Sequence, residues 1–180
     1  MKIGITGTHG TGKSTIVNNV YGLSFLETNS NVVKIDEVYR DICTSINKTD
    51  GIKPQESELL TLTTYYKQME LEYIAEMNNK SLICDRTPLD CFVYGNVFSP
   101  NFKYAMHMTV ARAHCDSYDK IYLIEPSDRP ITVDGFRNTS KKDQMTIHKL
   151  FLKEFAHKKN VIIVNQEKQD SIIEEIINLL

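Results

Sequence analysis

The residues with the clearest chemistry form a glycine-rich segment near the start of the chain, which reads Gly7-Thr8-His9-Gly10-Thr11-Gly12-Lys13-Ser14. It matches the phosphate-binding loop pattern G-x-x-x-x-G-K-[ST] and follows an apolar run typical of a buried strand. The glycines let successive backbone N–H groups turn toward a phosphate, and the helix that follows adds its positive N-terminal end. Lys13 would reach the β- and γ-phosphate oxygens, and the Ser14 hydroxyl would hold a Mg²⁺ ion. The segment predicts a nucleoside triphosphate site; the alternative is a glycine-rich turn that opens an ordinary helix.

Acidic side chains and one arginine follow three further strand-like runs. Glu37 follows residues 32–36, Asp85 and Arg86 follow residues 81–84, and Glu125 follows residues 120–124. Ligands of open α/β sheets bind at the carboxyl ends of the strands. We therefore expect these groups to meet beside the phosphate-binding loop.

Asp85 has the position of a Walker B acid, which would coordinate Mg²⁺ opposite Ser14. The alternative is that Asp85 caps the following helix, since Asp-Arg-Thr-Pro is also a good helix start. Arg86 would clamp a phosphate or an oxygen of the acceptor. Its alternative role is a salt bridge to a carboxylate at the rim of the sheet.

Glu37 could be the base that orients an acceptor hydroxyl for in-line attack. Arg40 lies one helical turn later, so the two side chains can share a helix face. A solvated glutamate at a helix start is the alternative, and Asp85 is the rival base. Asp36 is a weaker candidate, because strand alternation points it to the other side.

A polar segment at about 126–142 interrupts the alternating pattern and is expected to be a short lid. Lids that carry arginine exclude water and neutralise charge on a migrating phosphoryl group. Gly135 permits a sharp turn that would aim Arg137 inward, and Arg129 is a second candidate that would contact the nucleotide. The alternative is a charged surface loop.

The predicted site residues fall into three sets, and the predicted cofactors are ATP and Mg²⁺. The nucleotide-binding set is Gly7, Thr8, His9, Gly10, Thr11, Gly12, Lys13, Ser14, Thr15 and Arg129; the catalytic set is Glu37, Asp85, Arg86 and Arg137; the metal ligands are Ser14 and Asp85.

Strand-like and helix-like segments alternate along the chain, which predicts an α/β fold with helices on both faces of a parallel sheet. The segment at about 55–79 reads as a long amphipathic helix whose apolar residues recur every three or four positions. We expect this stripe to face the core rather than a ligand; it comprises Leu59, Leu62, Tyr66, Met69, Tyr73 and Met77.

Length and composition limit the number of domains, the class of partner and the cellular location that we expect. The 180 residues suit a single domain over 1–180, and a net charge of −2 gives no general attraction to nucleic acid. The four cysteines lack C-x-x-C spacing, which favours free thiols in a reducing cytosol. No signal peptide or membrane span is expected, so we predict a cytoplasmic protein, or one of the host cytoplasm if the source is a phage.

The chain resembles the small P-loop ATPase and kinase family that includes the nicotinamide riboside kinase domain and is similar to nucleoside and nucleotide kinases. The matching segments are Gly7–Ser14, Glu37-Val38-Tyr39-Arg40, Asp85-Arg86 with Asp90, Tyr118-Asp119 and Asp134-Gly135-Phe136-Arg137. The resemblance implies a three-layer fold with a five-stranded parallel sheet of order 2-3-1-4-5 and a short lid. It also implies transfer of the ATP γ-phosphate to a nucleoside-like acceptor.

Several functions remain open at this point. The acceptor would be a small nucleoside or nucleotide, or a hydroxymethylated pyrimidine in DNA, as for related phage enzymes. It would lie between the 55–79 helix and the helices at 86–115, where Tyr65, Tyr66, Phe92 and Tyr94 could stack on a base. A nucleotide-dependent switch is the competing class; Asn165-Gln166-Glu167-Lys168, near the adenine end of the sheet, does not match the guanine-reading Asn-Lys-x-Asp motif expected of a GTP switch. Oligomeric state is not predicted.

Overall fold

The computed structural model describes residues 1–28, 31–46, 58–98, 104–128 and 140–180. Strands and helices alternate through most of this part, as the sequence predicts. The strands are β1 (Lys2–Thr6), β2 (Val32–Ile35), β3 (Ser81–Asp85), β4 (Lys120–Ile124) and β5 (Val161–Val164). The α-helices are α1 (Lys13–Thr28), α2 (Val38–Ser45), α3 (Glu58–Met77), α4 (Pro88–Phe98), α5 (Ala105–Cys115), α6 (Lys141–Phe155) and α7 (Gln169–Leu179). A short 3₁₀ turn, η2 (Gln166–Lys168), precedes α7.

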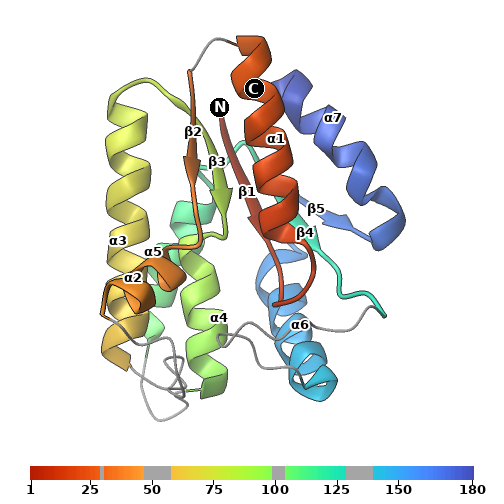
Figure 1. The fold of residues 1–180 in the computed structure, drawn as a ribbon. Helices are drawn as coiled ribbons and strands as arrows, with labels where there is room; N and C mark the ends of the chain where they lie inside the picture. The colour runs from red at the N-terminus through yellow and green to blue at the C-terminus, as the bar shows by residue number, and fades with distance from the viewer. Residues whose placement is uncertain (29–30, 47–57, 99–103, 129–139) are drawn as a thin grey trace.

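The five strands form one parallel sheet in the order β2-β3-β1-β4-β5, which confirms the expected order (Figure 1). β1 lies at the centre, with Ile5 paired to Asp85 of β3 on one side and to Tyr122 of β4 on the other. All strands therefore end at the same edge of the sheet. Parallel pairing is what brings the loop after β1 and the residues after β2 and β3 together.

Two hydrophobic clusters cover the two faces of the sheet. Helices α1 and α7 pack on one face, where Ile3, Ile5 and Ile83 are buried. Helices α3, α4, α5 and α6 lie on the other face, over Leu82 and Leu123 (Figure 1). Neighbouring strand residues point to opposite faces, so the central parts of β1, β3 and β4 carry apolar residues on both faces, as expected of a buried parallel sheet. The three-layer α/β fold is the predicted one.

The predicted buried face of α3 is wrong for four of its six residues, whereas Leu62 and Met69 are partly buried and pack against the core. Leu59, Tyr66, Tyr73 and Met77 are each more than half exposed. The buried side chains are Leu60, Thr61, Thr64, Tyr65, Gln68, Glu72 and Ala75. Periodicity of apolar residues failed because this face carries polar groups that find partners inside the protein, above all Glu72.

The Glu72 carboxylate is fully buried and has four partners. Its Oε2 lies 2.8 Å from Lys2 Nζ and 2.6 Å from His114 Nε2. Its Oε1 accepts hydrogen bonds from the Tyr118 hydroxyl at 2.6 Å and from Gln68 Nε2 at 2.9 Å. These partners replace water, so a charged residue can take a position that a sequence pattern reserves for apolar side chains.

Two other findings concern the chain as a whole. All four cysteines are free thiols. Among the described residues, no helix combines the length and apolar character that crossing a membrane would require.

Candidate functional site

The glycine-rich segment forms a tight loop between β1 and α1. Gly7, Gly10 and Gly12 have φ angles of +131°, +73° and +85°, a region that side chains with a Cβ rarely enter. At Gly7 a Cβ would lie 2.5 Å from the Ile124 carbonyl oxygen of the neighbouring strand β4. The loop is therefore pressed against the sheet, and its first glycine is required by both conformation and space.

Lys13 begins α1 and folds back over the loop. Its Nζ donates hydrogen bonds to the Thr8 carbonyl at 2.6 Å and to Thr11 Oγ1 at 3.3 Å, and the side chain is buried. Burial, with a further contribution from the Arg86 charge, lowers the pKa of Lys13 to about 7. A phosphate here would stabilise the ammonium form and could replace the carbonyl as its partner.

Residues far along the chain hold the loop from outside. Gln144 of α6 donates from Nε2 to the His9 carbonyl at 2.8 Å, and Gln169 of α7 donates to the Thr11 carbonyl at 3.4 Å. Within the loop, Thr11 Oγ1 donates to the Thr8 carbonyl at 2.9 Å. Of the predicted nucleotide-binding residues, Gly7 to Ser14 thus form one loop that leads into α1, and Thr15 is exposed on the first turn of that helix.

Ser14 and Asp85 meet across the ends of β1 and β3. The Ser14 hydroxyl donates to Asp85 Oδ2 at 2.5 Å. Asp85 Oδ1 is buried and has no hydrogen-bond partner among the described residues. Burial raises the pKa of Asp85, opposed by the Lys13 charge. An unpaired buried carboxylate oxygen beside a hydroxyl is a hard oxygen pair that suits Mg²⁺.

A different residue caps α4. Asp90 Oδ1 accepts hydrogen bonds from the Thr87 backbone N–H at 3.2 Å and from Thr87 Oγ1 at 2.7 Å. Thr87 directly precedes α4 and Asp90 lies in its first turn, so the carboxylate reaches back to the N-cap N–H, which is one half of a capping box. The helix start therefore leaves Asp85 available for another role.

Asp90 is a site residue that the sequence argument singled out only through the family resemblance. It is 1% exposed, and its Oδ1 also accepts from Thr6 Oγ1 at 2.7 Å. Its Oδ2 lies 3.4 Å from Arg86 Nη1. Burial raises the pKa of Asp90 while the Arg86 charge lowers it. The available signal was the acidic residue three positions after Thr87, which is typical of the first turn of a helix.

Arg86 stands where the phosphate-binding loop and the acidic residues meet. Its φ is +94°, unusual for a residue with a Cβ, and such strain costs roughly 1–3 kcal/mol. Its backbone N–H donates to the Ile5 carbonyl at 2.9 Å. The guanidinium lies 2.6 Å from Glu37 Oε1 through Nε and 3.4 Å from the Gly7 carbonyl through Nη1. The strained backbone aims this cation between the loop and Glu37.

Glu37 accepts from two arginines at once. Arg86 Nε lies 2.6 Å from Oε1 and Arg40 Nε lies 2.5 Å from Oε2, which confirms that Glu37 and Arg40 share a face. Burial alone would raise the pKa of Glu37, but the charges of Arg86 and Arg40 outweigh it and hold the pKa at about 2. Asp36 points away and pairs with Lys34 at 2.8 Å. Two of the roughly four lone-pair positions of the Glu37 carboxylate are thus occupied.

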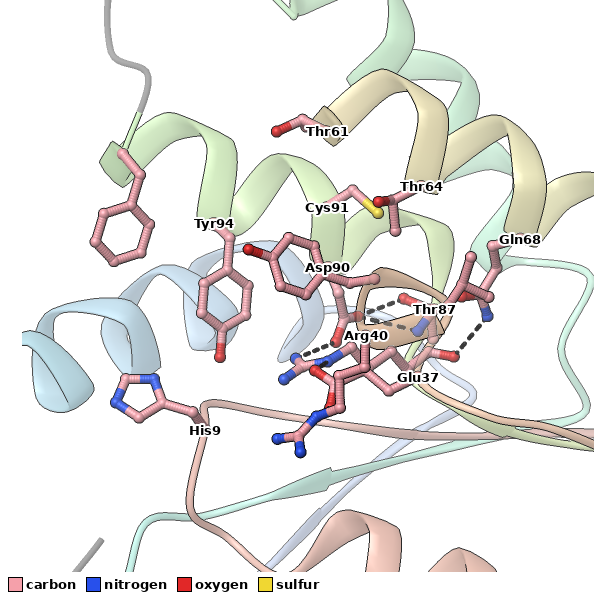
Figure 2. Close-up of a pocket in the computed structure, with 14 residues that line it drawn as sticks. His9, Glu37, Arg40, Thr61, Thr64, Gln68, Thr87, Asp90, Cys91 and Tyr94 are labelled. Atoms are coloured by element: carbon pink, nitrogen blue, oxygen red, sulfur yellow. Dashed lines mark hydrogen bonds and ion pairs between the residues drawn. The ribbon is translucent and has the colours of Figure 1, made fainter. Parts of the chain in front are cut away.

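A cleft of about 810 Å³ opens beside the loop, between α2, α3 and α4 (Figure 2). His9 lies at one end of the view and Gln68 at the other. The cleft is lined by His9, Glu37, Val38, Tyr39, Arg40, Thr61, Thr64, Gln68, Arg86, Thr87, Asp90, Cys91, Tyr94 and Phe98. Among the charged side chains that line this cleft, Glu37, Arg86 and Asp90 lie on the side near the loop.

The remaining predicted residues have different positions. Tyr94 lines the cleft, with the Arg86 guanidinium 5.0 Å from its ring centre. Tyr65 and Phe92 are buried in the core and Tyr66 is exposed, so these three do not form the expected stacking surface. Glu125 is not among the residues that line the cleft. Arg129, Arg137 and most of the predicted lid lie outside the described residues.

The sequence matches the family model described as "AAA domain" over residues 2–170. No curated protein matches it. Many solved structures match, and three examples cover nearly the whole of this chain at identities that support a shared fold only. A NadR protein in complex with NR has a TM-score of 0.68 at 19% identity, covering 97% of this chain and 50% of that one. Thymidylate kinase from Ehrlichia chaffeensis has a TM-score of 0.66 at 16% identity, and the match covers 99% of this chain and 97% of that one. NadR in complex with NAD and AMP-PNP has a TM-score of 0.66 at 17% identity, and the match covers 97% of this chain and 48% of that one. This chain thus spans about half of the NadR chains.

Proposed function

The chain belongs to the AAA domain family and has a P-loop fold like that of nucleoside and nucleotide kinases, and we propose that it is a Mg²⁺-dependent kinase. In this proposal it transfers the γ-phosphate of ATP to a hydroxyl of a nucleoside, a nucleotide or a modified base. A small-molecule acceptor is the first candidate, and modified DNA is the second.

One observation carries the proposal: Arg86 joins two neighbouring sites. Its Nη1 lies 3.4 Å from the Gly7 carbonyl of the phosphate-binding loop, and its side chain also lines the 810 Å³ cleft. A phosphoryl transferase needs a donor site and an acceptor site that share the space where the phosphoryl group moves. A cation between them would stabilise the charge that develops there.

The residues of the loop have distinct proposed roles. Lys13 binds the β- and γ-phosphate oxygens, and the backbone N–H groups of Gly10 to Lys13 surround the phosphates. Ser14 and Asp85 are the residues that would hold Mg²⁺. Bound there, the ion would neutralise phosphate charge.

On the acceptor side, Glu37 has lone-pair positions left to orient a hydroxyl. Its pKa of about 2 makes it a weak proton acceptor, so orientation is its main proposed contribution. Asp85, whose pKa burial raises, is the rival base. Arg129 and Arg137 remain proposed lid residues within a single domain.

The likeness to known proteins supports the same reaction class. The similar structures are those of a thymidylate kinase and of NadR proteins, one of which was solved with NAD and AMP-PNP. Their sites suggest that a nucleoside triphosphate and a second ligand related to nucleosides bind to this fold.

The direct test is a transfer assay with ATP labelled at the γ-phosphate. The acceptors are ribonucleosides, deoxynucleosides, their monophosphates, nicotinamide riboside and DNA with hydroxymethylated pyrimidines. We expect Mg²⁺-dependent label in one class of acceptor, and none with Lys13→Met. Binding of ATP without transfer to any acceptor would instead favour a nucleotide-dependent switch and overturn the proposal.

A further inference from the structure

One wall of the cleft consists of polar but uncharged side chains from α3. Thr64 and Gln68 are four residues apart and therefore share a helix face. They are 5% and 2% exposed, and both line the cleft. Figure 2 shows Gln68 at the opposite end of the cleft from His9, with its amide nitrogen bonded to the Arg86 backbone carbonyl. The chemistry of this wall depends on which of its hydrogen-bonding atoms the protein already uses.

The side-chain amide of Gln68 is fixed in one orientation. Its Nε2 donates to Glu72 Oε1 at 2.9 Å and to the Arg86 carbonyl at 3.0 Å. A carbonyl oxygen accepts only, and so does an ionised carboxylate. Although burial raises the pKa of Glu72, hydrogen bonds and charges from His114 and Lys2 outweigh it and lower that pKa, so Glu72 stays ionised. Flipping the amide would place its oxygen against two acceptors.

The orientation leaves Gln68 with only its oxygen to offer a ligand. Both N–H groups of the amide are used, and the bonds of this side chain within the described part of the chain all run through Nε2. The Glu72 network extends to Lys2, His114 and Tyr118, so the orientation rests on a buried set of partners rather than on one bond.

Thr64 has lost its donor in the same way. Its Oγ1 donates to the Leu60 carbonyl one turn earlier, at 2.8 Å. A hydroxyl has a single hydrogen, so only the lone pairs of Thr64 Oγ1 remain. Two neighbouring polar groups on this wall therefore accept hydrogen bonds and cannot donate them.

We propose that this wall of α3 selects an acceptor whose base presents N–H donors to Gln68 and Thr64. The inference rests on the proposed kinase function and deepens it. The reacting hydroxyl must lie near the phosphate-binding loop, next to Arg86 and Glu37. The part of the acceptor that reaches α3 is therefore the opposite end, which in a nucleoside is the base.

A base without such a donor leaves the buried oxygens of this wall unpaired, and that costs binding. Glu72 is a positioning residue in this scheme, because it acts through the Gln68 amide. The inference fixes the hydrogen-bonding character of the base edge and leaves the choice among bases to the transfer assay.

The first experiment changes the ligand and leaves the protein intact. Binding and phosphoryl transfer are measured for uridine against 3-methyluridine, and for adenosine against purine riboside, which lacks the amino group without added bulk. 5-Methyluridine controls for the size of a methyl group. For whichever base binds, we expect loss of the N–H donor to lower kcat/KM, and the binding constant, by about tenfold or more. Equal kcat/KM and equal binding for the two nucleosides of a pair would overturn the inference.

The second experiment tests the wall itself. Gln68→Met should reduce the preference for the donor-bearing member of the pair to about twofold or less, by weakening its binding. Thr64→Val should act in the same direction. Thr63→Val is the matched control, because Thr63 Oγ1 makes the same bond to the carbonyl four residues earlier, at 2.8 Å, on the exposed side of α3. An undiminished preference in Gln68→Met overturns the inference.

The readouts separate this inference from the proposed function. Discrimination in binding without any transfer would defeat the kinase proposal and leave the α3 wall as a base-reading surface. Transfer without discrimination would support the kinase and defeat the inference. If 2′- or 3′-deoxy analogues lose binding while base analogues do not, the wall reads sugar hydroxyls and the inference is wrong. Thermal unfolding of each variant identifies any that fail to fold.

Discussion

Arg86 Nε lies 2.6 Å from Glu37 Oε1, so a mostly buried ion pair joins the ends of β2 and β3 beside the phosphate-binding loop. The two residues are 49 positions apart in the chain. The pairing gives Glu37 a second function besides its proposed contact with an acceptor hydroxyl, since it also holds Arg86 in place.

Glu37→Gln should lower both transfer and stability. In the folded protein the pKa of Glu37 is about 2, against 4.5 ordinarily, so its stabilisation is present above pH 4.5 and is lost as the pH falls through about 2. This shift corresponds to roughly 3 kcal/mol. Urea unfolding between pH 6 and about 2.5 should show the wild-type advantage over Glu37→Gln shrinking toward acid. A constant difference would mean that the ion pair contributes no proton-linked stability.

Asp85→Asn should weaken the response to Mg²⁺ more than it weakens nucleotide binding, because it removes a charged oxygen ligand and keeps the shape. Without metal the variant should be at least as stable as the wild type, since burial raises the pKa of Asp85 and the charge is a cost. Activity is measured against Mg²⁺ concentration, with thermal unfolding in EDTA as the control. An unchanged Mg²⁺ titration would exclude Asp85 as a ligand.

Lys13→Met should abolish transfer without lowering the melting temperature. The folded pKa of Lys13 is about 7, below the ordinary 10.5, so the charged form is disfavoured and stability rises as the pH increases from 7 to 10.5. Removing the amine removes that pH dependence while methionine keeps most of the buried stem. Differential scanning calorimetry at pH 7 and 9 tests this. Large destabilisation would show that the hydrogen bonds to Thr8 and Thr11 hold the loop together.

Gly7→Ala should destabilise the protein by several kcal/mol or prevent folding, because the new Cβ would lie 2.5 Å from the Ile124 carbonyl at a φ of +131°. Gly22→Ala is the matched control. Gly22 lies within α1, where nothing is found within 4 Å of a Cβ, so alanine should stabilise by up to about 1 kcal/mol. Chemical denaturation of both variants provides the comparison. Similar effects at both sites would contradict the crowding of the loop against β4.

The corrected face of α3 predicts opposite outcomes for two tyrosines. Tyr65→Ala should cost about 3–5 kcal/mol, since Tyr65 is 3% exposed and packs 4.8 Å from the Phe92 ring. Tyr73→Ala should cost less than about 1 kcal/mol, since Tyr73 is 63% exposed. Urea midpoints at constant slope distinguish the two. A larger loss at Tyr73 would mean that another surface covers this side of α3.

The sequence alone determined the features that depend on local order. The glycine spacing from Gly7 to Ser14 specifies the phosphate-binding loop, because backbone freedom and a following helix are local properties. Apolar runs that end in polar residues located every strand, and the family resemblance supplied the strand order. Parallel strands share an edge, so Glu37, Asp85 and Arg86 were expected together, and the structure brings them together.

Tertiary structure decided which atoms remain free to act. The sequence could not show that Arg40 and Arg86 both bind the Glu37 carboxylate, since the pair with Arg86 joins distant segments. Nor could it show that Asp90 accepts from the Thr87 N–H at the start of α4. It also gave the wrong face of α3, because Glu72 finds its partners Lys2, His114 and Tyr118 only after folding. A buried polar group costs or contributes free energy according to its partners, and the fold alone supplies them.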